Sequence, residues 1–183
     1  FFDIGKRDLM CMAFIQRAEG WDNFYDGHMM QGVTIKDCAL YVRSWSESHK
    51  LGIRAIYLPH DGGVDRLGKE TNKSIADLFR ECGFHDVKVV PVIPRVMIGI
   101  EYVRERLPGM RFHKTNLSRQ YEFGTQRLSY LDAMNNYRFA PAAKQGKHIE
   151  PVHDIFSHPN DAIRTFAEGD HRGMIPKTAG LEA

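Results

Sequence analysis

The segment Ile-Arg-Ala-Ile-Tyr-Leu-Pro-His-Asp, residues 53–61, constrains the fold of this chain more than any other. Branched and aromatic residues dominate it, so it predicts a largely buried strand. Gly62 and Gly63 follow directly. His60 and Asp61 therefore stand just past the carboxyl end of a buried strand, where open α/β sheets place their chemistry. The simpler interpretation is that Asp61 only begins an Asp-Gly turn.

The segments on either side predict an alternation of strands and helices. Strands are expected at 1–5, 9–15, 87–92 and 110–113, and 20–32 is either a third antiparallel strand or a loop. Helices are expected between Thr34 and Gly52, from Asn72 or Ser74 to Gly83, and at 96–107, 118–137 and 157–167, with a loop or hairpin at 140–149 and a loose tail from about 170 to 183. This order favours one mixed α/β sheet with helices on both faces.

Size and charge set the class of protein. The 183 residues, 43% hydrophobic and 26% charged, suffice for a single globular domain spanning 1–183. The formal charge of +2 neither requires nor excludes nucleic acid. Three separated cysteines without Cys-x-x-Cys predict buried thiols in a reducing compartment. The sequence has no apolar run long enough to span a bilayer and no visible signal peptide, so no membrane partner is expected. The abrupt start inside a strand predicts a domain excised from a longer protein.

Three aspartates stand at site-like positions, and two of them, Asp3 and Asp61, would emerge at the same sheet edge if their strands are parallel neighbours. Asp3 ends the first strand, Asp61 ends the strand after the first helix, and Asp161 lies in the first turn of the last helix, on the same face as His158. Carboxylates that meet without partners repel one another, and a divalent cation would offset that cost. Oxygen ligands suit Mg²⁺ or Mn²⁺, and His favours Mn²⁺. Two such ions would activate water and stabilise the leaving oxygen of a phosphodiester.

Each of these side chains also has a simpler interpretation. Asp161 would stabilise its helix N-terminus through the helix dipole, and His158 would be a helix-start residue without a ligand role. Asp8 is interpreted as a turn residue. Asp154 is interpreted as a salt-bridging group beside the site, with ligation as a lesser alternative.

An ordered set of motifs resembles the nuclease domain of phage terminase large subunits. The set covers nearly the whole chain in the family's order, and its specificity lies in that order. The motifs are Phe2-Asp3-Ile4-Gly5 with Asp8, Tyr57-Leu58-Pro59-His60-Asp61, Gly99-Ile100-Glu101-Tyr102-Val103-Arg104, Asn136-Tyr137-Arg138, and a closing Ser157-His158-Pro159-Asn160-Asp161-Ala162-Ile163-Arg164. One departure is Gly62, where the family often has Ala.

The resemblance implies an RNase H-like fold and cleavage of double-stranded DNA by two Mg²⁺ or Mn²⁺ ions. It implies that Asp3, Asp61 and Asp161 form an acidic triad, with His158 as a neighbouring ligand or proton carrier. It further implies cutting of viral DNA concatemers during genome packaging, with little sequence specificity. The implied partners are an upstream ATPase domain of the same protein, the portal and the small terminase subunit. The implied location is the cytoplasm of an infected bacterial host, transiently on the procapsid.

Two alternatives stay open beside the terminase interpretation. One is a non-catalytic DNA-guiding or docking module of the same fold, and the other is a resolvase- or transposase-like nuclease. Three separate acids at site-like positions argue against the first alternative. The closing Ser-His-x-x-Asp-Ala pattern favours a terminase over the second.

Basic residues on the expected loops predict contacts to DNA phosphates, although they could equally be solvated. They are Lys6, Arg7, Arg66, Lys69, Lys144 and Lys147. Residues 63–70 nearly match a phosphate-binding loop, but Glu70 stands where Ser or Thr would hold Mg²⁺, so no nucleotide site is expected. His148, His153 and His158 recur at a spacing that does not keep one helix face, and no Cys joins them, so structural zinc is not expected.

Overall fold

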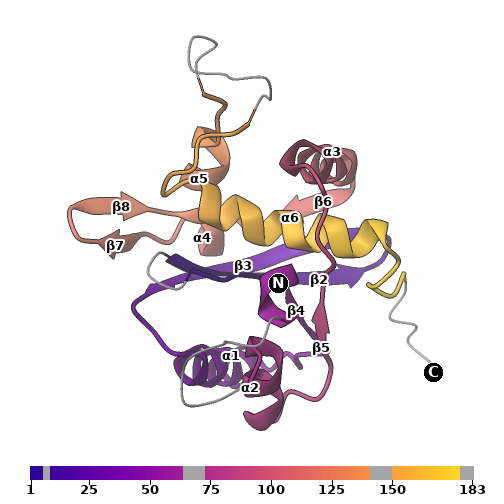
Figure 1. Ribbon diagram of the computed structural model, residues 1–183. Coiled ribbons are helices and arrows are strands. Elements are labelled where there is room, and N and C mark those ends of the chain that lie inside the picture. The colour runs from indigo at the N-terminus through magenta and orange to yellow at the C-terminus, as the bar shows by residue number, and fades with distance from the viewer. Residues whose placement is uncertain (6–8, 64–72, 141–149, 178–183) are drawn as a thin grey trace.

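The computed structural model describes residues 1–5, 9–63, 73–140 and 150–177, and it confirms the predicted mixed α/β class (Figure 1). The strands are β1 (Phe2–Asp3), β2 (Leu9–Ala18), β3 (Trp21–Gln31), β4 (Ile56–Leu58), β5 (Val87–Val89), β6 (Met110–Phe112), β7 (Tyr121–Phe123) and β8 (Gln126–Leu128). The helices are α1 (Ile35–His49), α2 (Ile75–Glu81), α3 (Val96–Arg106), α4 (Lys114–Leu117), α5 (Tyr130–Asn136) and α6 (Ser157–His171), with 3-10 turns η1 (His60–Gly63) and η2 (Leu107–Gly109). None of the described helices is long and apolar enough to cross a membrane.

The strands form separate hydrogen-bonded groups rather than the predicted single sheet. Among the described residues, the largest sheet has the order β1-β2-β3-β6, while β4 pairs with β5 and β7 pairs with β8. Strand β4 still lies beside β1 without sharing a ladder. The rings of Phe1 and Tyr57 stack with centroids 4.6 Å apart, and a Cβ on Gly62 would lie 3.2 Å from Ile4 Cδ1. These two contacts show that β1 and β4 run in the same direction, so Asp3, the last residue of β1, and Asp61, just after β4, lie at the same end.

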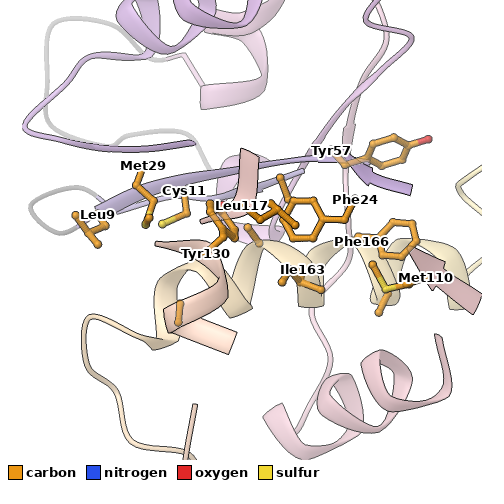
Figure 2. Close-up of a cluster of buried hydrophobic side chains, with 14 of the residues drawn as sticks. Leu9, Cys11, Phe24, Met29, Tyr57, Met110, Leu117, Tyr130, Ile163 and Phe166 are labelled. Carbon is orange, nitrogen blue, oxygen red and sulfur yellow. The ribbon is translucent and has the colours of Figure 1, made fainter. Parts of the chain in front are cut away.

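Side chains of β2 alternate between two apolar clusters on opposite faces of the sheet. Leu9, Cys11 and Ala13 join a cluster that includes residues of α6, and Figure 2 shows this cluster between the sheet and that helix. Met10 and Met12 join the other cluster, which includes residues of α1 and α2. Figure 1 shows α6 on one face and α1 with α2 on the other, so the predicted placement of helices on both faces is confirmed.

The segment 20–32 is a strand, as the first of its two interpretations held. Glu19 and Gly20 both have positive φ, 53° and 80°. Two successive residues in the left-handed region are typical of a type I′ turn, the two-residue hairpin loop whose twist matches that of the flanking strands. That turn joins β2 directly to β3, and together they form the long antiparallel pair that supports α6.

The single helix expected at 118–137 is wrong. Helix α4 ends at Leu117, and the β7–β8 hairpin precedes α5. Gly124 at the hairpin turn has φ +61°, which a right-handed helix does not accommodate. Ser129 then begins α5 with a capping box, in which its side chain accepts from Asp132 N and Asp132 accepts from the Ser129 backbone.

The loose tail expected from about 170 is also wrong within the described residues. Helix α6 continues to His171. After it, Ile175 is buried, and Tyr57 Oη donates a hydrogen bond to Met174 O at 3.1 Å. Contacts to β4 therefore order this segment, and residues 178–183 lie outside the described part of the chain.

An ion network fixes the carboxyl-terminal end of α6 to the sheet. Arg17 lies 2.7 Å from Asp22 and 2.7 Å from Asp170. Arg106 of α3 contacts the same two carboxylates. Asp22 is only 1% exposed, so the two guanidinium groups supply the positive charge that a buried carboxylate requires.

Candidate functional site

The first contact of the site joins β1, near the amino terminus, to α6, the last helix. Asp3 ends β1, and His158 lies in the first turn of α6. His158 Nδ1 is 3.0 Å from Asp3 Oδ2 across 155 residues of sequence. Both side chains are largely covered but reachable, with 12% and 19% of their surface exposed. The structure thus brings together two of the four predicted site residues.

Asp161 lies one helical turn after His158 in an environment that disfavours its charge. Its pKa is raised from 3.8 to about 6, chiefly because burial removes the carboxylate from water. The positive charge of Arg164 opposes this rise, and the negative charge of Asp3 adds to it. Arg164 Nη1 lies 2.6 Å from Asp161 Oδ1. The guanidinium therefore offsets only part of the cost that burial places on the negative charge of Asp161.

Asp61 lies at the same end of the strands but is exposed to solvent on η1. The next residue, Gly62, is buried, and a Cβ there would lie 2.7 Å from Leu58 Cβ. This close approach gives a physical reason for Gly rather than Ala at 62. His60, on the same turn, interacts by charge with Glu168 of α6. The turn therefore lies near both β1 and α6, and the metal role of Asp61 stays a prediction.

The four residues do not form a complete metal-binding cluster as they stand. Within the described ranges, no three His, Cys, Asp or Glu side chains are placed to hold one metal ion. The donor chemistry nevertheless suits Mg²⁺ or Mn²⁺, because it offers carboxylate oxygens and one imidazole. The raised pKa of Asp161 shows that burial leaves its negative charge only partly compensated.

Sequence reasoning missed several groups around these residues. Glu168 Oε1 lies 3.2 Å from Arg164 Nε, so Arg164 touches two carboxylates of α6. The spacing Asp161, Arg164, Glu168 is the helical spacing that places side chains on one face, and this signal was present in the sequence. His153 is a further neighbour, with its ring centroid 5.2 Å from that of His158.

Two groups near the site, the buried Cys11 thiol and the half-buried Tyr137 hydroxyl, have pKa values raised in part by its negative charge. Burial raises the pKa of the Cys11 thiol well above its usual value, and the charges of Asp3 and Asp161 raise it further. Burial raises the pKa of Tyr137 to about 12, and Asp161 contributes to that rise. Cys11 is fully buried and Cys38 is buried too, as predicted, whereas Cys82 is half-buried.

Of the remaining predictions, one is a contact that the structure has, and the others fall on residues outside the described part of the chain. Asp154 Oδ2 is 3.0 Å from Arg138 Nη2, which agrees with its interpretation as a salt-bridging group. The predicted turn residue Asp8 lies outside the described residues. So do the six basic residues predicted to contact DNA, namely Lys6, Arg7, Arg66, Lys69, Lys144 and Lys147.

Comparison with known proteins gives a structural likeness only. No family profile matches the chain, and no curated protein sequence matches it. Solved structures of the large terminase from a thermophilic bacteriophage are similar in fold. One crystal form gives a TM-score of 0.66 at 14% identity, over 91% of this chain and 37% of that one. The complex with ATP-gamma-S gives 0.65 at 15% identity, over 91% and 38%.

At such identity the likeness concerns the fold and leaves activity to be argued from the site. The chain spans about 38% of the length of the solved terminase that it resembles. What these comparisons establish is therefore that its mixed α/β fold matches part of a phage large terminase.

Proposed function

We propose that this chain is a metal-dependent DNA endonuclease with an RNase H-like fold, of the type found in terminase large subunits. The observation that carries the proposal is the meeting of Asp3 and His158, with Asp161 coupled to both by charge. The resemblance of the motifs and the likeness in fold to a large terminase point the same way.

The proposed chemistry assigns each residue a task. Asp3, Asp61, Asp161 and His158 would hold Mg²⁺ or Mn²⁺, which would supply an activated water and stabilise the leaving oxygen of a phosphodiester. The contact of His158 Nδ1 with Asp3 orients the imidazole and favours the proton on that nitrogen. Partial burial of Asp161 strengthens its interaction with a cation, because water screens the charge less there.

The wider proposal follows the terminase resemblance. The substrate is double-stranded viral DNA, cut during genome packaging with little sequence preference because no base-reading motif is present in the sequence. The proposed partners are an ATPase domain of the same protein, the portal and the small terminase subunit. The basic residues Lys6, Arg7, Arg66, Lys69, Lys144 and Lys147 are proposed to hold the phosphate backbone.

A plasmid-digestion assay with Mg²⁺, Mn²⁺ and EDTA lanes tests the proposal. The wild-type protein is expected to cut the plasmid with either ion and to leave it intact in EDTA. Asp161→Asn and Asp3→Asn are expected to lose cleavage, because each removes a charged ligand while keeping the side chain's size. Glu101→Gln is the matched control, since Glu101 is an exposed helical carboxylate paired with Arg104.

The alternatives give different results in the same experiment. Wild-type protein that binds plasmid yet never cuts it with either ion would indicate a DNA-guiding or docking module. Cleavage of a four-way junction far faster than of plasmid would indicate a resolvase-like nuclease. Equal cleavage by wild type and Asp161→Asn would refute the assigned site.

A further inference from the structure

Arg164 is held between two carboxylates on one face of α6. Its Nη1 lies 2.6 Å from Asp161 Oδ1, and its Nε lies 3.2 Å from Glu168 Oε1. All three side chains are largely covered, with 22%, 18% and 15% of their surface exposed for Arg164, Asp161 and Glu168. The guanidinium fork therefore connects the acidic site to a second carboxylate nearly two turns further along the helix.

Helix α3 closes over this pair at Gly99. A Cβ on Gly99 would lie 2.4 Å from Glu168 Oε1 and 2.6 Å from Arg164 Cδ. Both values are below the distance at which atoms can coexist without movement. The glycine thus leaves the space that the Arg164 stem and the Glu168 carboxylate occupy, and α3 limits where they can go.

A lone arginine beside a metal-binding aspartate would repel the incoming cation. Here Arg164 also pairs with Glu168, whose negative charge balances the positive charge of the guanidinium. Arg164 can therefore fix one oxygen of Asp161 without cancelling the attraction of that carboxylate for a cation. The oxygen that receives the Arg164 hydrogen bond is Oδ1.

We propose that Arg164 is a positioning residue for Asp161, and that Glu168 is the counter-charge that makes this positioning compatible with a bound divalent cation. The inference rests on the proposed function, because it assigns Asp161 to a cation. It adds to that function a role for two residues of α6 and for the glycine of α3 that accommodates them. Neither Arg164 nor Glu168 is assigned to touch the cation or the DNA.

The test measures Mn²⁺ binding by calorimetry without DNA, beside thermal unfolding in EDTA. Glu168→Gln is expected to weaken Mn²⁺ binding by roughly tenfold, the usual scale for losing a partner behind a metal ligand. In plasmid cleavage, the Mn²⁺ concentration for half-maximal rate is expected to rise by the same factor, with the maximal rate kept. The control Glu101→Gln breaks a solvent-exposed Glu–Arg pair on α3 and is expected to leave Mn²⁺ binding unchanged.

A double variant separates charge from general disruption. Adding Arg164→Gln to Glu168→Gln removes the uncompensated positive charge but also the contact of Arg164 with Asp161, so Mn²⁺ binding is expected to recover part of the tenfold loss. Such a recovery is a coupling between neighbours that additive structural damage does not produce. A double variant that binds Mn²⁺ more weakly than Glu168→Gln would overturn the counter-charge role.

Gly99→Ala provides a second variant that changes no charge. Its Cβ would displace flexible side-chain atoms rather than backbone, and Ala favours the helix, so the fold is expected to persist. Mn²⁺ binding is expected to weaken, whereas Gly109→Ala, where a Cβ would meet nothing within 4 Å, is expected to bind normally.

The outcomes distinguish this inference from the proposed function. Wild-type protein that binds no Mn²⁺ would overturn both. Wild-type protein that binds Mn²⁺ while Glu168→Gln and Gly99→Ala bind it equally well would overturn the positioning role alone.

Discussion

Replacing Asp161 by Asn should stabilise the metal-free protein at neutral pH. The amide keeps the size of the side chain and removes a negative charge that burial disfavours. The folded pKa of about 6 lies above the ordinary value of 3.8. The folded state therefore binds a proton more tightly than the unfolded state does, and stability from this group is lost as the pH rises between those two values.

The size of the effect follows from the same two pKa values. A rise from 3.8 to about 6 corresponds to about 3 kcal/mol of unfolding free energy at neutral pH. The pKa already includes the favourable interaction with Arg164. Asn loses that ion pair, but Arg164 keeps Glu168 as a partner. We therefore expect a gain of about 1–3 kcal/mol for Asp161→Asn at neutral pH, shrinking toward zero in acid.

Urea unfolding in EDTA, followed from about pH 4 to about pH 8, measures this gain. The difference between Asp161→Asn and wild type should rise through the range in which Asp161 ionises. Aspartates with lowered pKa values, such as the capping residues Asp37, Asp77 and Asp132, titrate in both proteins and cancel in the difference. Asp86→Asn, at a half-exposed surface aspartate paired with Lys88, is the control.

A difference that stays flat across the pH range, or that favours wild type at neutral pH, would refute the reasoning. The addition of Mn²⁺ provides a second check. A ligand that binds only the folded protein stabilises it by mass action. Mn²⁺ should therefore stabilise wild type at neutral pH and leave Asp161→Asn nearly unchanged.

Asp61→Asn should abolish plasmid cleavage and remove most of the stabilisation by Mn²⁺. Because Asp61 is exposed on its turn, the unfolding free energy of the metal-free protein should change by less than about 0.5 kcal/mol. A variant that still nicks plasmid at the wild-type rate would leave Asp61 as a turn residue only, since Asn forms the same local bonds. Gly27→Ala should lower the unfolding free energy by about 1–3 kcal/mol, because its Cβ would lie 2.3 Å from the buried Tyr130 ring. Urea unfolding compares this variant with Gly52→Ala, where the added Cβ meets open space. Equal stability of the two variants would contradict the prediction.

Sequence patterns with a clear period or cap predicted most of the fold. The Thr34 cap and the helix after Phe156 begin where their local signals placed them. The strand before Asp61 forms only over residues 56–58 of the predicted segment. The segment 118–137 failed because its apolar residues fit a helix period, while Gly124 and Ser129 set a hairpin and a new start. The separation of β4 from β1 depends on strand spacing across the sheet, which no local pattern contains.

The candidate site divides in a similar way. The contact of Asp3 with His158 agrees with the grouping of site residues that the family resemblance implied. The charge balance around Asp161 was not expected, because it depends on burial and on Gly99 of a different helix. Spacing along α6 could have suggested Arg164 and Glu168, but it carries no information about the helix that packs over them.

The ion network at the far end of α6 has a consequence for ligand binding. Asp170 is tied to Arg17 and Arg106 near one end of the helix, and His158 is tied to Asp3 near the other. A helix anchored near both ends cannot tilt or slide without breaking a largely covered contact. Its freedom of rigid-body motion is therefore lost during folding rather than during binding. A ligand that reaches the first turn of α6 meets groups already held in place, and less of its binding free energy is spent on ordering them.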